Sequence, residues 1–306
     1  MIATVDIREV ECAARATDQL GETPLWCERE KKLWWLDVER PKLQSFDPAT
    51  GRHEVQSLAT TFLGSQALGE DGSHLVALDL ELYRRSHTTG ALSPFAPRIE
   101  PGLDNRLNDG RVDARGRFWV GTMDNQLHRP SGSLYRVDGD GTSAQTFGDV
   151  IVSNGIAFSP DNRFLYFTDT RRHLTWRFDF DLDEGRIFNR QIFADYSASG
   201  ERPDGACVDV DGGIWTAFFG GRRVVRYRPD GVIDVVIPMP VTNPTCVCFG
   251  GNDLRTLYIT TATKFLTPEQ RTTEPLGGSL LAVHGIGQGL PEHRFRFNHA
   301  PPGAPT

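Results

Sequence analysis

One sequence pattern recurs six times along this chain and limits what the chain can fold into. Each copy has a short apolar segment, a turn rich in Asp, Gly, Pro or Asn, an aromatic segment such as LWWLD, and a third segment such as LYRVD. The copies begin at Gly21, Ser65, Asn108, Ser153, Pro203 and Asn243. Starts that are roughly 40–50 residues apart match the length of a four-stranded propeller blade. The repeat therefore predicts an all-β, six-bladed β-propeller with four antiparallel strands in each blade.

The residues within each copy agree with strands joined by tight turns. Val, Ile, Leu, Phe, Trp and Tyr favour strands, and the DG, DN and GG pairs supply the positive-φ positions of hairpins. No segment has a long apolar period of 3.6 residues, so helices should be few. We interpret the aromatic residues Trp34, Trp35, Trp119 and Trp215 as core packing of the blades.

The ends of the chain and one interruption complete the predicted architecture. We expect the segment from Ile7 to Cys12 to add the outer strand of the last blade, because closing the ring removes exposed sheet edges. The stretch from Lys264 to Gly278 interrupts the sixth copy and is predicted to be a loop. We predict one domain over residues 1–298 and a disordered tail over residues 299–306.

Charge and composition argue against several partners. The net charge is −7, whereas nucleic acids and anionic membranes attract basic surfaces. No apolar run approaches the roughly 20 residues that span a bilayer, and Asp6, Arg8 and Glu9 interrupt the first residues, unlike in a signal peptide. The five cysteines form no CxxC pair, so we interpret Cys246 and Cys248 as small buried hydrophobic residues. These features predict a cytoplasmic protein without nucleic-acid or membrane partners, and they leave the oligomeric state open.

The polar residues that open the copies indicate where the chemistry lies. The first strand of each blade lines the channel of a propeller, so equivalent positions should form a ring around the axis. These positions hold Glu22, Ser65 with Gln66, Asn108 with Asp109, Asn154, Asp204 and Asn243. Carboxylates that converge on one axis repel each other unless a cation lies between them. Turn chemistry could account for part of the pattern, because Asn and Asp favour turns.

An all-oxygen ligand set favours a hard divalent cation such as calcium, magnesium or manganese, and zinc or ferrous iron is an alternative. With few protein ligands, coordination positions stay open for water and substrate, as in catalytic metal sites. The sequence therefore predicts one divalent cation in the channel, with calcium and zinc as the first candidates.

Four motifs together resemble a known family. They are LGETPLW from Leu20, RLNDGRVDARGRFWVGTM from Arg106, SNGIAFSPD from Ser153 and RPDGACVD from Arg202. In this order and spacing they resemble the SMP-30/gluconolactonase family, which includes regucalcin and bacterial aldonolactonases. The resemblance covers nearly the whole chain. It implies the six-bladed propeller and a metal-dependent hydrolysis of a sugar lactone to the aldonic acid.

The resemblance also assigns roles to individual residues. It implies that Glu22, Asn154 and Asp204 are the metal ligands. Asp204 is the expected general base, which would take a proton from the attacking water and pass it to the leaving ring oxygen. Arg106 and Asn108 are expected to hold the hydroxyl groups and ring oxygen of the substrate.

Two departures from the family pattern are visible. Some members have an acidic residue shortly after GTM, whereas here Asp124 follows directly and Asn125 comes next. We take Asp124 as the candidate substrate contact, with Asn125 as the alternative. The usual Gly after LGE is Thr23, which should leave the metal site intact because Glu22 is retained.

Two further groups have both a structural and a functional interpretation. His128 follows the third aromatic segment and could touch substrate, although an exposed position is favoured. Arg171, Arg172 and His173 form a basic cluster in the fourth copy. The cluster is either a solvated loop or a cover of the channel mouth that attracts an acidic sugar.

Two other functions stay open, because one propeller fold hosts many functions. A non-catalytic calcium- or protein-binding propeller would bind metal without turnover. A paraoxonase-like or luciferin-regenerating hydrolase would prefer aryl esters, phosphotriesters or nitriles, and bulky apolar residues at the channel mouth would favour it. The many small polar residues of this chain favour a sugar lactone.

Overall fold

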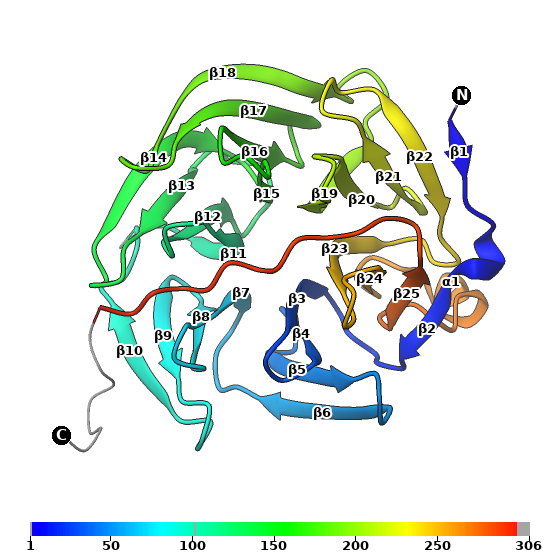
Figure 1. Ribbon diagram of the computed structural model, residues 1–306, viewed down its shortest axis with the longest axis horizontal. Coiled ribbons are helices and arrows are strands. Elements are labelled where there is room, and N and C mark those ends of the chain that lie inside the picture. Colours follow the sequence, from blue (N-terminus) through cyan, green and yellow to red (C-terminus); the bar gives the residue numbers. More distant parts are fainter. Residues whose placement is uncertain (1, 101, 299–306) are drawn as a thin grey trace.

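The computed structural model describes residues 2–100 and 102–298, which form six β-sheets around a central axis (Figure 1). Five sheets have four strands and one has five. The predicted six-bladed, all-β propeller is therefore confirmed. The predicted tail, residues 299–306, lies outside the described residues.

The strands of the first three blades follow one another along the chain. Blade 1 consists of β3 (Gly21–Cys27), β4 (Lys32–Asp37), β5 (Lys42–Asp47) and β6 (Arg52–Ser57). Blade 2 consists of β7 (Leu63–Leu68), β8 (His74–Leu78), β9 (Glu81–Arg85) and β10 (Leu92–Ala96). Blade 3 consists of β11 (Asn105–Val112), β12 (Phe118–Asp124), β13 (Gly132–Val137) and β14 (Ser143–Val150).

The remaining blades repeat this order, and the last takes one strand from the N-terminal segment. Blade 4 consists of β15 (Ser153–Phe158), β16 (Phe164–Asp169), β17 (Leu174–Asp181) and β18 (Arg186–Asp195). Blade 5 consists of β19 (Arg202–Val208), β20 (Ile214–Phe219), β21 (Arg223–Tyr227) and β22 (Ile233–Pro238). Blade 6 consists of β23 (Pro244–Gly250), β24 (Thr256–Thr261), β25 (Leu280–His284) and β2 (Glu11–Ala14).

The N-terminal segment closes the ring as predicted, although its strand begins later than the predicted segment from Ile7 to Cys12, and it also extends blade 5. β2 pairs antiparallel with β25 as the outer strand of blade 6. Before it, Ile7–Glu9 forms a single 3-10 turn, and β1 (Ala3–Thr4) pairs parallel with β22 of blade 5. The segment therefore joins two neighbouring blades.

The interruption of the sixth copy is not wholly a loop. Between β24 and β25 it contains a short helix, α1 (Pro268–Thr273). Thr267 caps this helix by accepting a hydrogen bond from the backbone N–H of Gln270, whose side chain accepts one from Thr267 in return. No helix in the described part of the chain is both long and apolar enough to cross a membrane.

The segment after β25 crosses one end of the central channel (Figure 1). Its backbone bonds to the turns of four blades, at Val210, Leu254, Glu70 and Gly116. Glu292 of this segment forms an ion pair of 2.7 Å with Arg111 of β11. The innermost strands begin at the opposite end of the channel.

Each innermost strand has a register shift near its start, at the position of the polar residues. The shifts lie between Glu22 and Leu25, Leu63 and Ser65, Leu107 and Gly110, Asn154 and Ala157, Pro203 and Ala206, and Pro244 and Cys246. Such bulges bend a strand and redirect its side chains. A local feature common to all blades thus aims these residues at the axis.

The predicted core aromatic residues are held in place by buried aspartates. Trp35, Trp119 and Trp215 are fully buried, whereas Trp34 is half-buried. The indole N–H of each fully buried tryptophan donates a 2.8 Å hydrogen bond to a buried aspartate. The three aspartates are Asp18, Asp113 and Asp209.

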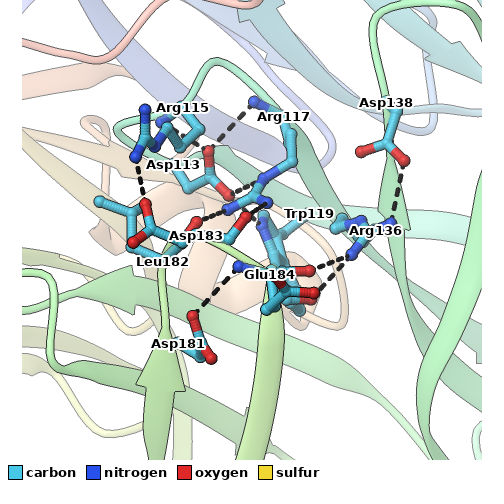
Figure 2. Close-up of polar contacts among 11 residues, drawn as sticks. Asp113, Arg115, Arg117, Trp119, Arg136, Asp138, Asp181, Leu182, Asp183 and Glu184 are labelled. Carbon is cyan, nitrogen blue, oxygen red and sulfur yellow. Dashed lines mark hydrogen bonds and ion pairs between the residues drawn. The ribbon is translucent and has the colours of Figure 1, made fainter.

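Figure 2 shows how one of these anchors extends into the contact between two blades. Asp113 accepts from Trp119 and, at 2.7 Å, from Arg117 of blade 3. Arg117 and Arg136 in turn donate to backbone oxygens of the β17–β18 turn in blade 4. The anchors are therefore part of the packing between blades.

Candidate functional site

One pocket lies where the innermost strands of blades 1, 3, 4 and 5 begin. It is lined by Leu20, Glu22, Arg106, Asn108, Met123, Leu127, Val152, Asn154, Thr170, Arg171, Arg202, Asp204, Phe219, Lys264 and Phe265. The structure thus brings together five of the residues predicted for the site, namely Glu22, Arg106, Asn108, Asn154 and Asp204.

The three predicted metal ligands reach this pocket from three blades. Glu22 lies on β3, Asn154 on β15 and Asp204 on β19. Their exposed fractions are 7%, 4% and 4%, so all three are buried at the bottom of the pocket. Rigid strands from separate blades hold these groups in place.

The two carboxylates lack the donors that a buried charge requires. Asp204 Oδ1 is buried and has no hydrogen-bond partner within the described residues. Glu22 accepts one bond, from the backbone N–H of Thr23 at 3.3 Å. Burial first, and then the neighbouring carboxylates, raise the pKa of both groups well above the usual range. A divalent cation would supply the missing positive charge, so these residues fit a metal.

The third predicted metal ligand is an amide. In the described part of the chain, no three His, Cys, Asp or Glu side chains form a group that could hold a metal. Asn154 adds a neutral oxygen to the two carboxylates, and calcium and magnesium readily accept amide oxygens. The predicted ligand set therefore consists of oxygen atoms only.

A chain of hydrogen bonds fixes the orientation of this amide. Arg106 Nη1 donates to Asn108 Oδ1 at 2.5 Å, and Asn108 Nδ2 donates to Asn154 Oδ1 at 2.9 Å. Asn154 Nδ2 donates to the Thr170 hydroxyl at 2.9 Å, which donates to the carbonyl of Pro203 at 2.7 Å. Because Arg106 can only donate, the chain has one direction, and it places Oδ1 of Asn154 toward Asn108 and Nδ2 toward Thr170.

Arg106 is a buried cation beside the carboxylates. Burial lowers its pKa to about 10, although Glu39, Glu22 and Asp204 act in the opposite direction. The guanidinium therefore remains protonated at neutral pH. Its carbon Cζ lies 5.2 Å from the centre of the Phe62 ring, which limits its movement.

Asp109 lies next to the site without lining the pocket. Its carboxylate accepts a 2.8 Å hydrogen bond from the backbone N–H of Ile156, and burial raises its pKa to about 6. The blade 2 and blade 6 members of the predicted ring also do not line the pocket. Gln66 instead donates to the carbonyl of Thr23, and Asn243 donates to the carbonyl of Lys264.

Asp124 does not reach the pocket, so the geometry does not meet the expectation of a substrate contact there. Its carboxylate is fully buried and accepts a 2.6 Å bond from Arg129, as well as bonds from the backbone of His128 and Arg129. Asn125 also lies outside the lining and donates to Asp104. His128 is exposed. Asp124 therefore holds its own loop in shape.

Several lining residues were not predicted from the sequence. Arg202 is two positions before Asp204 on β19, so strand alternation directs both side chains to one face. This two-residue spacing from Asp204 is the sequence feature that could have identified Arg202. Phe219 pairs with Arg202 across the sheet, whereas Lys264 and Phe265 come from the irregular segment after β24. That segment has no counterpart in the other copies, so comparison of the copies could not identify its residues.

Comparison with known proteins agrees with this geometry. Residues 20–263 match the family described as the SMP-30/Gluconolactonase/LRE-like region. This chain belongs to that family. The match spans all four motifs and every lining residue except Lys264 and Phe265.

Relatives of the SMP-30/gluconolactonase family align over almost their full length. A 6-deoxy-6-sulfogluconolactonase of Pseudomonas putida is 39% identical over 94% of this chain and 98% of its own. Regucalcin of Gallus gallus is 31% identical over 94% of this chain and 98% of its own. The crystal structure of a calcium-binding protein, regucalcin of Agrobacterium tumefaciens, superposes with a TM-score of 0.90 at 30% identity and covers 97% of this chain and 99% of that one.

Proposed function

We propose that this protein hydrolyses a sugar lactone to the aldonic acid and depends on one divalent cation. The observation that carries the proposal is the buried Asp204 carboxylate, whose Oδ1 has no hydrogen-bond partner within the described residues and which lines one pocket with Glu22 and Asn154. Membership of a family with lactonase relatives supports the reaction class. Glu22, Asn154 and Asp204 would hold the cation, with calcium or zinc as the first candidates.

When bound, the cation would supply Lewis-acid stabilisation of the negative charge that develops on the lactone carbonyl oxygen. The remaining steps belong to residues of the chain. Asp204 would take a proton from the attacking water and return it to the leaving ring oxygen. Both transfers occur at the bottom of the pocket, where Asp204 is shielded from bulk water.

Arg106 and Asn108 would orient the polyol. Both side chains line the pocket, and their mutual hydrogen bond fixes the guanidinium of Arg106 as a donor. Asn108 donates its two amide hydrogens to Ser153 and Asn154, so it would contribute its Oδ1 as an acceptor. Orientation by fixed donors lowers the entropic cost of reaching the transition state. Thr170 would act through Asn154 as a positioning residue, because its hydroxyl accepts from that amide.

The decisive experiment measures acid release from a panel of aldonolactones, with a pH indicator, on chelator-treated protein to which single metals are restored. Each rate is compared with spontaneous hydrolysis. Turnover that disappears with the metal and returns with one cation supports the proposal. Metal binding without turnover of any lactone would overturn it.

Two observations favour second candidates, and the same panel separates them. The likeness to a calcium-binding regucalcin favours a non-catalytic calcium-binding protein, which would show binding without turnover. Phe219 and Phe265 place two aromatic rings on the pocket wall, which favours an aryl-ester hydrolase. An aryl ester such as phenyl acetate is therefore included, and a preference for it would replace the sugar.

A further inference from the structure

We propose that Arg171 and Arg202 form an anion-binding subsite at the pocket mouth, which selects lactones that carry a negatively charged group remote from the carbonyl. This inference rests on the proposed lactonase function and names its substrate class. The charged group is a sulfonate, phosphate or carboxylate, because a guanidinium binds the oxygens of each in the same way.

The charge of the pocket differs from that of the whole protein. The chain has a net charge of −7. The pocket is lined by the cations Arg106, Arg171, Arg202 and Lys264 and by the carboxylates Glu22 and Asp204. Once a divalent cation neutralises the two carboxylates, the cationic side chains remain as excess positive charge around the cavity. Such a cavity attracts an anionic ligand.

Two of these cations already have partners inside the protein. Lys264 forms an ion pair with Glu39, and Arg106 donates to Asn108. Arg106 is buried, whereas Arg171 is exposed and Arg202 is half-buried, and no carboxylate of residues 2–100 and 102–298 lies within ion-pair distance of either Arg171 or Arg202. These two guanidinium groups are therefore available to an external anion.

Both arginines are held in place without their charge being neutralised. The Cζ atom of Arg202 lies 5.1 Å from the centre of the Phe219 ring. The backbone N–H of Arg171 donates to Asp169 at 3.1 Å, and its Nε donates to the carbonyl of Leu127 at 3.0 Å. A guanidinium that is already positioned loses less conformational entropy when it binds.

Depth in the pocket places this subsite away from the reacting carbonyl. Asp204 is buried, Arg202 is half-buried and Arg171 is exposed. A lactone carbonyl at Asp204 therefore directs the other end of the sugar toward the two arginines. Of the basic cluster predicted from the sequence, Arg171 alone lines the pocket, because Arg172 pairs with Asp149 and Asp169.

The test compares gluconolactone with its 6-phosphate and 6-sulfonate analogues and with a glucaric acid lactone, on metal-loaded protein. We expect kcat/KM for at least one anionic lactone to exceed that of gluconolactone by about tenfold or more. Arg171→Gln and Arg202→Gln should each lower this ratio by about tenfold, mainly through KM. Increasing ionic strength should lower the ratio in the wild type. The best analogue identifies the anion.

Arg228→Gln is the matched control, because it removes one positive charge from an exposed pair with Asp230 far from the pocket lining. In this variant the ratio of kcat/KM for the anionic lactone to kcat/KM for gluconolactone should equal that of the wild type. Arg202→Lys keeps the charge and should lose less than Arg202→Gln, which separates a charge effect from a folding defect.

The outcomes distinguish this inference from the function on which it rests. Hydrolysis of gluconolactone with a ratio near one, or a ratio that both arginine variants leave unchanged, would overturn the subsite and leave the lactonase intact. If no lactone is hydrolysed, the lactonase proposal fails, and calorimetry with 6-deoxy-6-sulfogluconate tests the subsite alone. Binding that both variants weaken tenfold supports the subsite, and absence of binding rejects it.

Discussion

Two aspartates of blade 5 lie at opposite ends of one strand and have opposite surroundings. Asp209, just after β19, accepts hydrogen bonds from the backbone of Asp211 and Gly213, from the Trp215 indole and from Arg226. Asp204, near the start of the strand, has a buried oxygen without any partner within the described residues. Both carboxylates are buried.

The comparison shows that burial alone does not define a functional carboxylate. A buried carboxylate whose oxygens accept hydrogen bonds from the protein is compensated within the fold. A buried carboxylate with an unpaired oxygen can still accept a donor or a cation from a ligand. Asp209 at one end of β19 therefore supports the fold, and Asp204 at the other end belongs to the candidate site. Substitutions at the two ends of β19 should therefore differ in their effects on turnover and on stability.

The substitution Asp204→Asn should lower kcat by about 10²–10⁴-fold, because the general base is lost. In chelator-treated protein it should not reduce the free energy of unfolding, because it removes a buried charge that lacks a partner. Both quantities can be measured, by acid release and by denaturant titration. Near-native turnover with metal bound would show that Asp204 is not the base.

The substitution Asp209→Ala should have the opposite profile. It should lower the free energy of unfolding by about 3–5 kcal/mol, because Arg226 and the Trp215 indole lose a buried acceptor. Turnover per folded molecule should stay at the wild-type value. Denaturant titration checks the first expectation, and Asp209→Asn, which keeps an acceptor oxygen, should lose less. Equal losses of stability at Asp204 and Asp209 would contradict the comparison.

Asp18 lies between these two cases and should give a pH effect. It anchors the Trp35 indole as Asp209 anchors Trp215, but its other donor, Gln44, is neutral. Burial raises the pKa of Asp18 to about 7. Between about pH 4 and pH 7 the folded protein keeps a proton that the unfolded chain releases, so the free energy of unfolding falls as pH rises.

We expect Asp18→Asn to remove this part of the pH dependence. Relative to the wild type, the variant should gain about 4 kcal/mol between pH 4 and pH 8. Denaturant titrations at both pH values, in chelator, measure the difference. Parallel pH profiles for the two proteins would show that Asp18 does not hold the proton.

The smallest effect is expected beside Glu22. Thr23 has a φ of 45°, which is costly for a β-branched residue and free of strain for glycine. Thr23→Gly should therefore raise the free energy of unfolding by about 1 kcal/mol. Thr23→Ala keeps the unfavourable φ and serves as the control. A gain with Ala equal to that with Gly would attribute the effect to the side chain, whose hydroxyl is buried without a partner within the described residues.

The sequence predicted the ring of blades because each copy repeats the same local chemistry. It placed Glu22, Asn154 and Asp204 together for the same reason, since equivalent strand positions meet at the axis. Lys264 and Phe265 were missed because they belong to the segment that has no counterpart in other copies. Asp124 was assigned from its place after a motif, and nothing in the sequence reveals that Arg129 folds back onto it.

The pairing of β2 with β25 has a consequence for how the protein is made. β2 is translated well before its partner strand β25, because β3 to β24 lie between them in the chain. At about 5–20 residues per second, β2 waits on the order of tens of seconds for that partner. Glu11 at the start of this waiting strand is charged and solvent-exposed, which discourages pairing with other chains in the interval.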